Sequence, residues 1–217
     1  MSQTVAYKEL AAMLRGAIAQ IREHHATLSE LDSVGGDGDH GTTMVRAMAN
    51  MEKAIGDSAS GQLKDLLFDV GWAIMGVDGG ATGPLFGSLF MGMSEAVEGK
   101  DTLDAPTVAA MFEAGLAAIE AQTKARVGDK TLMDALTPAV AALRAAADAG
   151  QDIPACLRSA ADAAAQGAIA TKDLPTRFGR AKNIGERTIG YQDPGATSMS
   201  FIFRGFAGGV EDVKRET

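Results

Sequence analysis

The stretch ELDSVGGDGDHGTTMVRAM, residues 30–48, separates two segments of helical periodicity by a glycine-rich loop that carries three carboxylates. These are Asp32, Asp37 and Asp39, and glycine permits the backbone angles that bring such side chains to one point. Apolar residues precede and follow the loop at intervals of three and four, as on the buried face of a helix. The stretch therefore predicts two helices joined by a loop whose aspartates are candidates for a functional site.

The same periodicity continues along the chain and predicts eight helices. The apolar stripes lie at residues 10–21, 44–55, 63–74, 85–97, 108–119, 132–143, 157–169 and 194–206. Asp129 is the candidate N-cap of the sixth helix, with a capping box at Thr131 and Asp134 as the alternative, and Asp193 is the candidate N-cap of the eighth. Short links and the lack of an alternating strand pattern favour an all-α, antiparallel up-and-down bundle, one domain over residues 1–217.

The composition restricts the class of protein. A hydrophobic fraction of 46% suffices for a core, and a net charge of −8 argues against nucleic acid as the main partner. The single cysteine, Cys156, rules out an internal disulfide and suits a small buried position, and Trp72 and the methionines are expected in the core. Neither an apolar signal core nor an apolar run of about 18 residues is present. We therefore expect a soluble, cytoplasmic protein without a membrane partner.

The loop GDGDHG matches G-x-G-x-x-G literally, but a helix precedes it where a dinucleotide fold needs a strand, and its aspartates would repel a pyrophosphate. A calcium loop counted from Asp37 would need a glutamate where Met48 stands. Three carboxylates on a glycine-rich turn instead suit Mg²⁺ shared with substrate phosphates. Free N–H groups near Thr42 and Thr43, at the start of the next helix, would add an anion site. An acidic surface turn that only caps a helix remains the alternative.

Three further junctions of loop and helix carry weaker signals. In the motif GVDGGATGPLFG, Ala81 and Thr82 could contact a phosphate; alternatively, its small residues allow a close helix crossing. In the motif VGDKTLMDAL, Leu132 and Met133 could form the apolar walls of a base-binding site; alternatively, the motif is a plain capped helix. The segment at 172–193 lacks a helical stripe and is net positive in an acidic protein, so a functional loop is favoured over disorder. The four junctions precede every second helix, which in an up-and-down bundle places them at one end.

The three histidines receive different interpretations. His40 lies beside the aspartates and could donate to a phosphate oxygen, or stabilise the turn. His24 and His25 are expected at the exposed end of the first helix.

Four motifs in order resemble the nucleotide-binding L subunit (DhaL family) of dihydroxyacetone kinase. They are GDGDHG with the preceding Asp32, GGATGPLFG, GDKTLMDAL and GRAKNIGERTIGYQDPGATS, and the resemblance extends over residues 10–206. It implies a closed barrel of eight antiparallel helices with the nucleotide, ADP or ATP, at one end. It also implies two Mg²⁺ ions held by Asp32, Asp37 and Asp39. The implied nucleotide contacts are His40, Gly41, Thr42, Thr43, Ala81, Thr82, Thr123, Leu132, Arg180, Asp193, Pro194 and Gly195.

The resemblance further implies a phosphotransferase that is active only with a partner. A K subunit would hold a short ketose covalently, while this chain supplies the phosphoryl group and Arg180 and His40 stabilise phosphate charge. The donor would be ATP, or ADP recharged by a phosphocarrier M subunit of the phosphoenolpyruvate phosphotransferase system. Thr123 and Leu132 depart from the glycine and methionine of carrier-coupled relatives, so the donor stays open. The three- or four-carbon ketose and a homodimeric state also stay open.

Two other functions are alternatives to this one. A nucleotide-sensing partner of a transcription regulator is compatible with the same site, and activity of a reconstituted pair of K and L subunits would distinguish the two. A purely structural bundle would leave the clustered carboxylates and the basic loop without a purpose.

Overall fold

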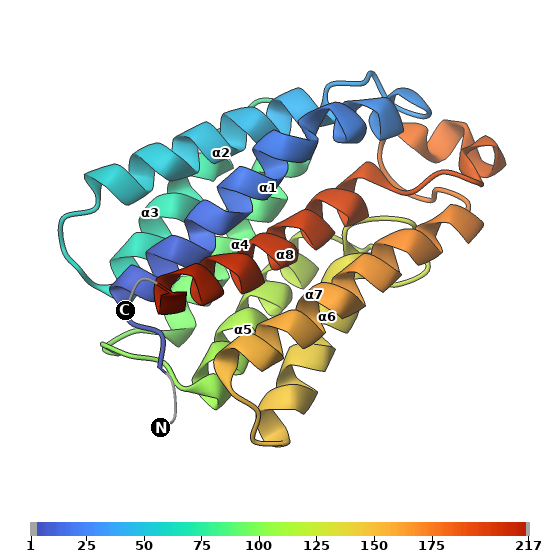
Figure 1. Cartoon of the computed structure of the whole chain (residues 1–217). Coiled ribbons are helices and arrows are strands. Elements are labelled where there is room, and N and C mark those ends of the chain that lie inside the picture. Colours follow the sequence, from blue (N-terminus) through green and yellow to red (C-terminus); the bar gives the residue numbers. More distant parts are fainter. Residues whose placement is uncertain (1–3, 216–217) are drawn as a thin grey trace.

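The computed structural model describes residues 4–215, so that residues 1–3 and 216–217 of the predicted domain lie outside it. Within this range the chain folds into eight α-helices and three short 3₁₀ helices (Figure 1). The helices are α1 (Tyr7–Ser33), α2 (His40–Asp57), α3 (Leu63–Met75), α4 (Thr82–Ala96), α5 (Ala105–Gln122), α6 (Met133–Asp148), α7 (Ile153–Ala170) and α8 (Pro194–Arg215). The 3₁₀ helices are η1 (Thr171–Asp173), η2 (Arg180–Asn183) and η3 (Gly185–Thr188), all between α7 and α8.

The eight helices form a closed ring. Each helix packs against the next one along the chain, and α8 returns to pack against α1, which closes the ring (Figure 1). Apolar faces fill the centre, where the buried rings of Phe112, Phe203 and Phe206 lie with centroids 5.3 to 5.9 Å apart. Such tilted and edge-to-face pairs are favourable arrangements of aromatic rings. The predicted all-α closed bundle is confirmed.

The contact between α1 and α8 depends on small residues. A Cβ atom on Gly205 would lie 2.4 Å from the Cα of Ala17, and one on Gly16 would lie 2.1 Å from the carbonyl oxygen of Gly205. No side chain fits at such distances, because real Cβ contacts are longer than 3 Å. Glycine at both positions therefore lets the first and last helices touch through their backbones.

The helix starts agree with the predictions in part. The Asp193 carboxylate accepts a hydrogen bond of 2.7 Å from the N–H of Ala196 and so caps α8, as predicted. The prediction for Asp129 was wrong: α6 begins at Met133, and the Asp129 carboxylate accepts from the N–H of Arg126 in the preceding turn. The alternative, a capping box at Thr131 and Asp134, agrees better with the structure, because the Asp134 carboxylate accepts a hydrogen bond of 2.7 Å from the N–H of Thr131.

Two other predictions were wrong. Trp72 is 67% exposed on the outer face of α3 and does not belong to the core. His24 and His25 lie inside α1 and not at its end. His25 is exposed as expected, whereas the ring of His24 is half-buried and stacks on Phe201 at a centroid distance of 4.3 Å. Cys156 is buried as expected. No helix within the described residues is long and apolar enough to cross a membrane.

Candidate functional site

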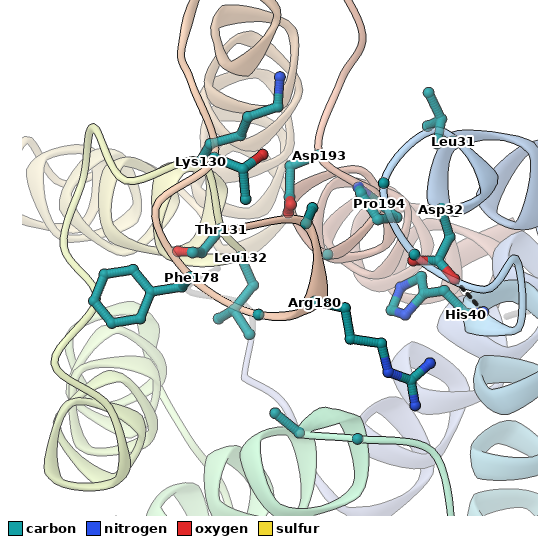
Figure 2. A pocket seen from close by; sticks show the side chains of 18 of the residues that line it. Leu31, Asp32, His40, Lys130, Thr131, Leu132, Phe178, Arg180, Asp193 and Pro194 are labelled. Atoms are coloured by element: carbon teal, nitrogen blue, oxygen red, sulfur yellow. Dashed lines mark hydrogen bonds between the residues drawn. The ribbon is translucent and has the colours of Figure 1, made fainter. Parts of the chain in front are cut away.

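The four loop-to-helix junctions that precede α2, α4, α6 and α8 meet at one end of the ring. There they surround a cavity of about 560 Å³, together with the loop between α7 and α8 (Figure 2). This volume lies within the range of about 300–1,000 Å³ of small-molecule sites. The meeting follows from the topology, because alternate junctions of an up-and-down bundle lie at the same end. The predicted shared end is therefore confirmed.

Most of the predicted site residues line this cavity. They are Asp32, Asp39, His40, Ala81, Thr82, Thr123, Leu132, Arg180, Asp193, Pro194 and Gly195. Asp37, Gly41, Thr42 and Thr43 are not among the lining residues: Gly41 and Thr43 are buried in α2, and Asp37 and Thr42 are exposed. The hydroxyl of Thr43 accepts a hydrogen bond of 3.0 Å from Arg46.

The three aspartates of the first loop converge. One carboxylate oxygen from each of Asp32, Asp37 and Asp39 lies within 4.8 Å of the others. Gly36 makes this possible, because a Cβ atom there would lie 2.3 Å from Oδ1 of Asp32. The second oxygen of Asp32 accepts a hydrogen bond of 3.3 Å from the N–H of His40, at the positive end of α2. The loop thus folds over one carboxylate and brings the other two beside it.

Arg180 neutralises part of this negative charge. Its Nη1 forms an ion pair with Asp37 and lies 3.7 Å from Oδ1 of Asp39. Desolvation raises the pKa of Asp37, but the Arg180 charge and local hydrogen bonds outweigh it and hold the pKa below its ordinary value. Desolvation and then the Asp37 charge raise the pKa of Asp39. Three oxygen ligands that need a cation fit a hard ion such as Mg²⁺.

Burial favours the neutral form of the His40 imidazole beside the aspartates. Burial lowers its pKa, against the opposing effects of the Asp32 charge and a hydrogen bond to the backbone of Pro194. Its Nε2 lies 3.2 Å from the hydroxyl of Ser198, which donates to the carbonyl oxygen of Gly195 at 2.9 Å. Sequence reasoning missed Ser198, although it ends one of the four motifs. A neutral, fixed imidazole provides a hydrogen bond without adding charge.

The opposite side of the cavity is apolar. Figure 2 shows Leu132 and Phe178 on one side, Asp32 and His40 on the other, and Arg180 between them. Leu132 was predicted as an apolar wall, and Phe178 lies in the loop 172–193 that was predicted to be functional. The cavity therefore suits a ligand with a flat apolar ring at one end and anionic groups at the other.

Two buried ionisable groups complete the lining. Burial raises the pKa of Asp193 to about 7, although the N–H of Ala196 and the charge of Lys130 act in the opposite direction. Lys130 is 3% exposed and was not predicted to have a role. Lysine is rarely buried, and nothing in the local pattern GDKT distinguishes this side chain from an exposed one.

Comparisons with known proteins agree with this geometry. The family model for the DAK2 domain matches residues 34–208. The chain is 39% identical over 184 residues to the ADP-binding subunit DhaL of PEP-dependent dihydroxyacetone kinase 1 from Listeria innocua, covering 85% of this chain and 87% of that protein. It is 34% identical over 177 residues to the DhaL subunit of the Escherichia coli enzyme, covering 82% and 84% of the two chains.

A solved structure supports the same relationship. The dihydroxyacetone kinase of C. freundii, in complex with AMP-PNP and Mg²⁺, matches with a TM-score of 0.74 and 26% identity. The match covers 96% of this chain and 35% of that one, so this chain spans about a third of that kinase. The chain therefore belongs to the DAK2-domain family, together with the ADP-binding DhaL subunits of dihydroxyacetone kinases.

Proposed function

We propose that this chain is the nucleotide- and Mg²⁺-binding subunit of a dihydroxyacetone-type kinase, and that it supplies a phosphoryl group to a short ketose held on a partner subunit. The observation that carries the proposal is the cavity itself, which places three converging carboxylates and Arg180 opposite an apolar wall. The names of the relatives, ADP-binding subunits of dihydroxyacetone kinases, support the same nucleotide and reaction.

In this proposal the ring of helices is a single nucleotide-binding domain. The base of the nucleotide lies against Leu132 and Phe178, and the phosphates lie towards Arg180 and His40. Asp32, Asp37 and Asp39 hold two Mg²⁺ ions. The remaining proposed contacts are Gly41, Thr42, Thr43, Ala81, Thr82, Thr123, Asp193, Pro194 and Gly195.

The charged and polar side chains of the site have different electrostatic roles. Three carboxylates would repel a polyphosphate, and Mg²⁺, when bound, supplies the positive charge that lets the two approach. Arg180 now pairs with Asp37, so a cation on the carboxylates would release its guanidinium to pair with phosphate. His40, neutral and fixed by Ser198, donates or accepts without changing the charge balance. Such preorganised groups stabilise the charge that develops during phosphoryl transfer.

The partners follow from the same assignment. A K subunit would hold the ketose, and either ATP or a phosphocarrier M subunit would renew the phosphoryl group. The names of the two bacterial relatives describe PEP-dependent kinases, which favours a resident ADP recharged in place. The nucleotide released on denaturing the purified protein distinguishes these routes, since near-stoichiometric ADP supports recharging and an empty site that binds Mg²⁺-ATP reversibly supports direct use of ATP.

The decisive test of the site uses Asp37→Asn and Asp39→Asn. Each change preserves the shape of the side chain and removes one anionic ligand. We expect Mg²⁺-dependent ADP binding, measured by calorimetry, to weaken at least about tenfold in each variant, which corresponds to 1.4 kcal/mol, with unchanged helical circular dichroism. Asp162→Asn, an exposed position on α7, is the matched control and should bind as the parent does. Full Mg²⁺-dependent binding in both loop variants would refute the metal assignment.

A further inference from the structure

Lys130 is a buried cation that the proposed chemistry does not use. It is 3% exposed and has a φ of 59°, a left-handed conformation that non-glycine residues rarely adopt. Its side chain is directed away from Arg180 and from His40 (Figure 2). A buried charge in an unfavourable backbone conformation requires compensating contacts elsewhere.

Those contacts are three main-chain carbonyl groups of the loop between α7 and α8. Nζ of Lys130 donates to the carbonyl oxygens of Leu174 at 3.1 Å, Thr188 at 2.8 Å and Tyr191 at 2.7 Å. An ammonium group has three donors, so each has an acceptor. Leu174 lies on the arm of the loop that leaves α7, whereas Thr188 and Tyr191 lie on the arm that returns to α8. One side chain in the turn before α6 therefore joins both arms.

The two arms also bond to each other at this level. The N–H of Gly190 donates to the carbonyl oxygen of Lys172 at 2.8 Å, and the hydroxyls of Thr176 and Thr188 lie 2.9 Å apart. We call this paired region, 172–176 with 188–191, the neck of the loop. Beyond the neck the tip, 177–187, carries Arg180. The position of the tip therefore depends on what holds the neck.

The tip rests on the acidic loop. A Cβ atom on Gly35 would lie 2.6 Å from the Cβ of Ala181, so Ala181 packs directly against the turn that bears the aspartates. Arg180, its neighbour, pairs with Asp37. A loosened neck would thus withdraw the arginine from the carboxylates.

Desolvation lowers the pKa of Lys130 below its ordinary value, and the charges of Asp193, Asp134 and Asp173 offset this effect only in part. A second tether lies nearer the surface: the N–H of Arg177 donates to the carbonyl oxygen of Asp129 at 3.3 Å, and the Arg177 side chain, 64% exposed, approaches the Asp129 carboxylate at 3.4 Å. Exposed ion pairs contribute little, whereas hydrogen bonds from a buried charged donor are stronger. Lys130 is accordingly the main anchor of the neck.

We propose that Lys130 is a positioning residue that anchors both arms of the α7–α8 loop to the turn before α6 and thereby keeps Arg180 over the cavity. Through Arg180 it slows the release of a Mg²⁺-nucleotide without touching it. The effect on release rests on the proposed function, but the anchoring does not.

The anchoring is tested first, on the protein without nucleotide. Lys130→Met retains the length and the backbone conformation and removes the ammonium group, and Lys182→Met, exposed in the tip, is the matched control. We expect amide hydrogen exchange of peptides within 172–191 to accelerate roughly tenfold or more in Lys130→Met, because three hydrogen bonds from a charged donor are lost. The exchange rates of peptides from α2 to α4 should be unchanged, and Lys182→Met should exchange at the rates of the parent protein. Unchanged exchange at the neck overturns the proposal.

The coupling to the site is tested by dissociation of a fluorescent ADP analogue in the presence of Mg²⁺. Lys130→Met and Arg180→Gln should each release it faster, and the double variant should release it no faster than Arg180→Gln alone, because the lysine acts through the arginine. Fully additive effects, or unchanged release by Lys130→Met, overturn the link through Arg180. A merely structural role would accelerate exchange throughout the ring, which also counts against the proposal.

The remaining outcomes are also informative. If the parent binds no nucleotide at all, the proposed function fails, while the exchange experiment still decides the anchoring. If Lys130→Met does not fold, Lys130→Gln serves the same comparison, because it keeps two N–H donors on a shorter, uncharged chain.

Discussion

Replacing Asp193 with Asn should remove a pH dependence that the buried carboxyl group imposes on stability. Burial raises the pKa of this group to about 7, from an ordinary value of 3.8. The amide of asparagine keeps an oxygen that accepts from the N–H of Ala196, so the cap of α8 survives the change. The substitution thus isolates the ionisation from the hydrogen bond.

The sign follows from proton binding. Between pH 4 and pH 7 the folded protein keeps the proton on Asp193, whereas the unfolded chain has released it, so stability falls as the pH rises through this window. Each pKa unit corresponds to about 1.4 kcal/mol, so the parent should lose roughly 2–3 kcal/mol of unfolding free energy through this group between pH 5 and pH 7. Below pH 4 the contribution is fully present, and above pH 7 it is gone.

The measurement is urea unfolding at pH 5, 6, 7 and 8, with a chelator and without nucleotide so that ligand binding adds no stability. Far-ultraviolet circular dichroism is the appropriate signal, because Trp72 is 67% exposed and its fluorescence reports weakly on the core. The difference between Asp193→Asn and the parent should grow in favour of the variant from pH 5 to pH 8. Asp162→Asn, an exposed control, should run parallel to the parent. Parallel profiles for Asp193→Asn as well would refute the reasoning.

Four further substitutions have defined outcomes. Gly208→Ala should raise unfolding free energy by about 0.5–1 kcal/mol in urea, since a Cβ there meets nothing within 4 Å and alanine favours the helix; a loss of stability would contradict this. Its neighbour Gly209→Ala should instead destabilise by at least about 2 kcal/mol, as its Cβ would lie 2.2 Å from a carbonyl oxygen of α1. Phe203→Ala should cost about 3–5 kcal/mol in the same assay, because its ring is fully buried. Gly36→Ala should weaken Mg²⁺-ADP binding in calorimetry with little change in helicity, because its Cβ would strike Asp32; undiminished affinity would count against the loop geometry.

The helices, and the end of the bundle at which the site lies, could be predicted because both depend on local sequence pattern and simple topology. Apolar spacing marks the buried face of each helix, and alternation of direction brings every second junction to one end. The error at Trp72 was avoidable on the same grounds: Val70 and Ile74 are buried on the stripe, and residue 72 falls on the opposite face of α3. The helical spacing, and not the size of the side chain, decides on which face of α3 residue 72 lies.

The contacts of Lys130 and Ser198 could not be predicted in this way. The partners of Lys130 lie 44, 58 and 61 positions away, and no local signal marks a lysine that will be buried against distant carbonyl groups. Ser198 contacts His40 only because the start of α8 lies beside the start of α2 in the folded ring. Likewise the cap of α6 had several acidic and hydroxyl candidates within a few residues, and the tertiary packing selects among them.

The closure of the ring by α8 determines when the cavity comes into existence. Ser198 and His40 are 158 positions apart, and the helix that carries Ser198 is synthesised after the other seven. A chain still emerging from the ribosome, with α1 to α7 complete, lacks Asp193, Pro194 and Gly195 and thus one wall of the cavity. A ligand that binds this cavity would therefore stabilise only chains in which α8 has closed the ring, and not those that still lack α8.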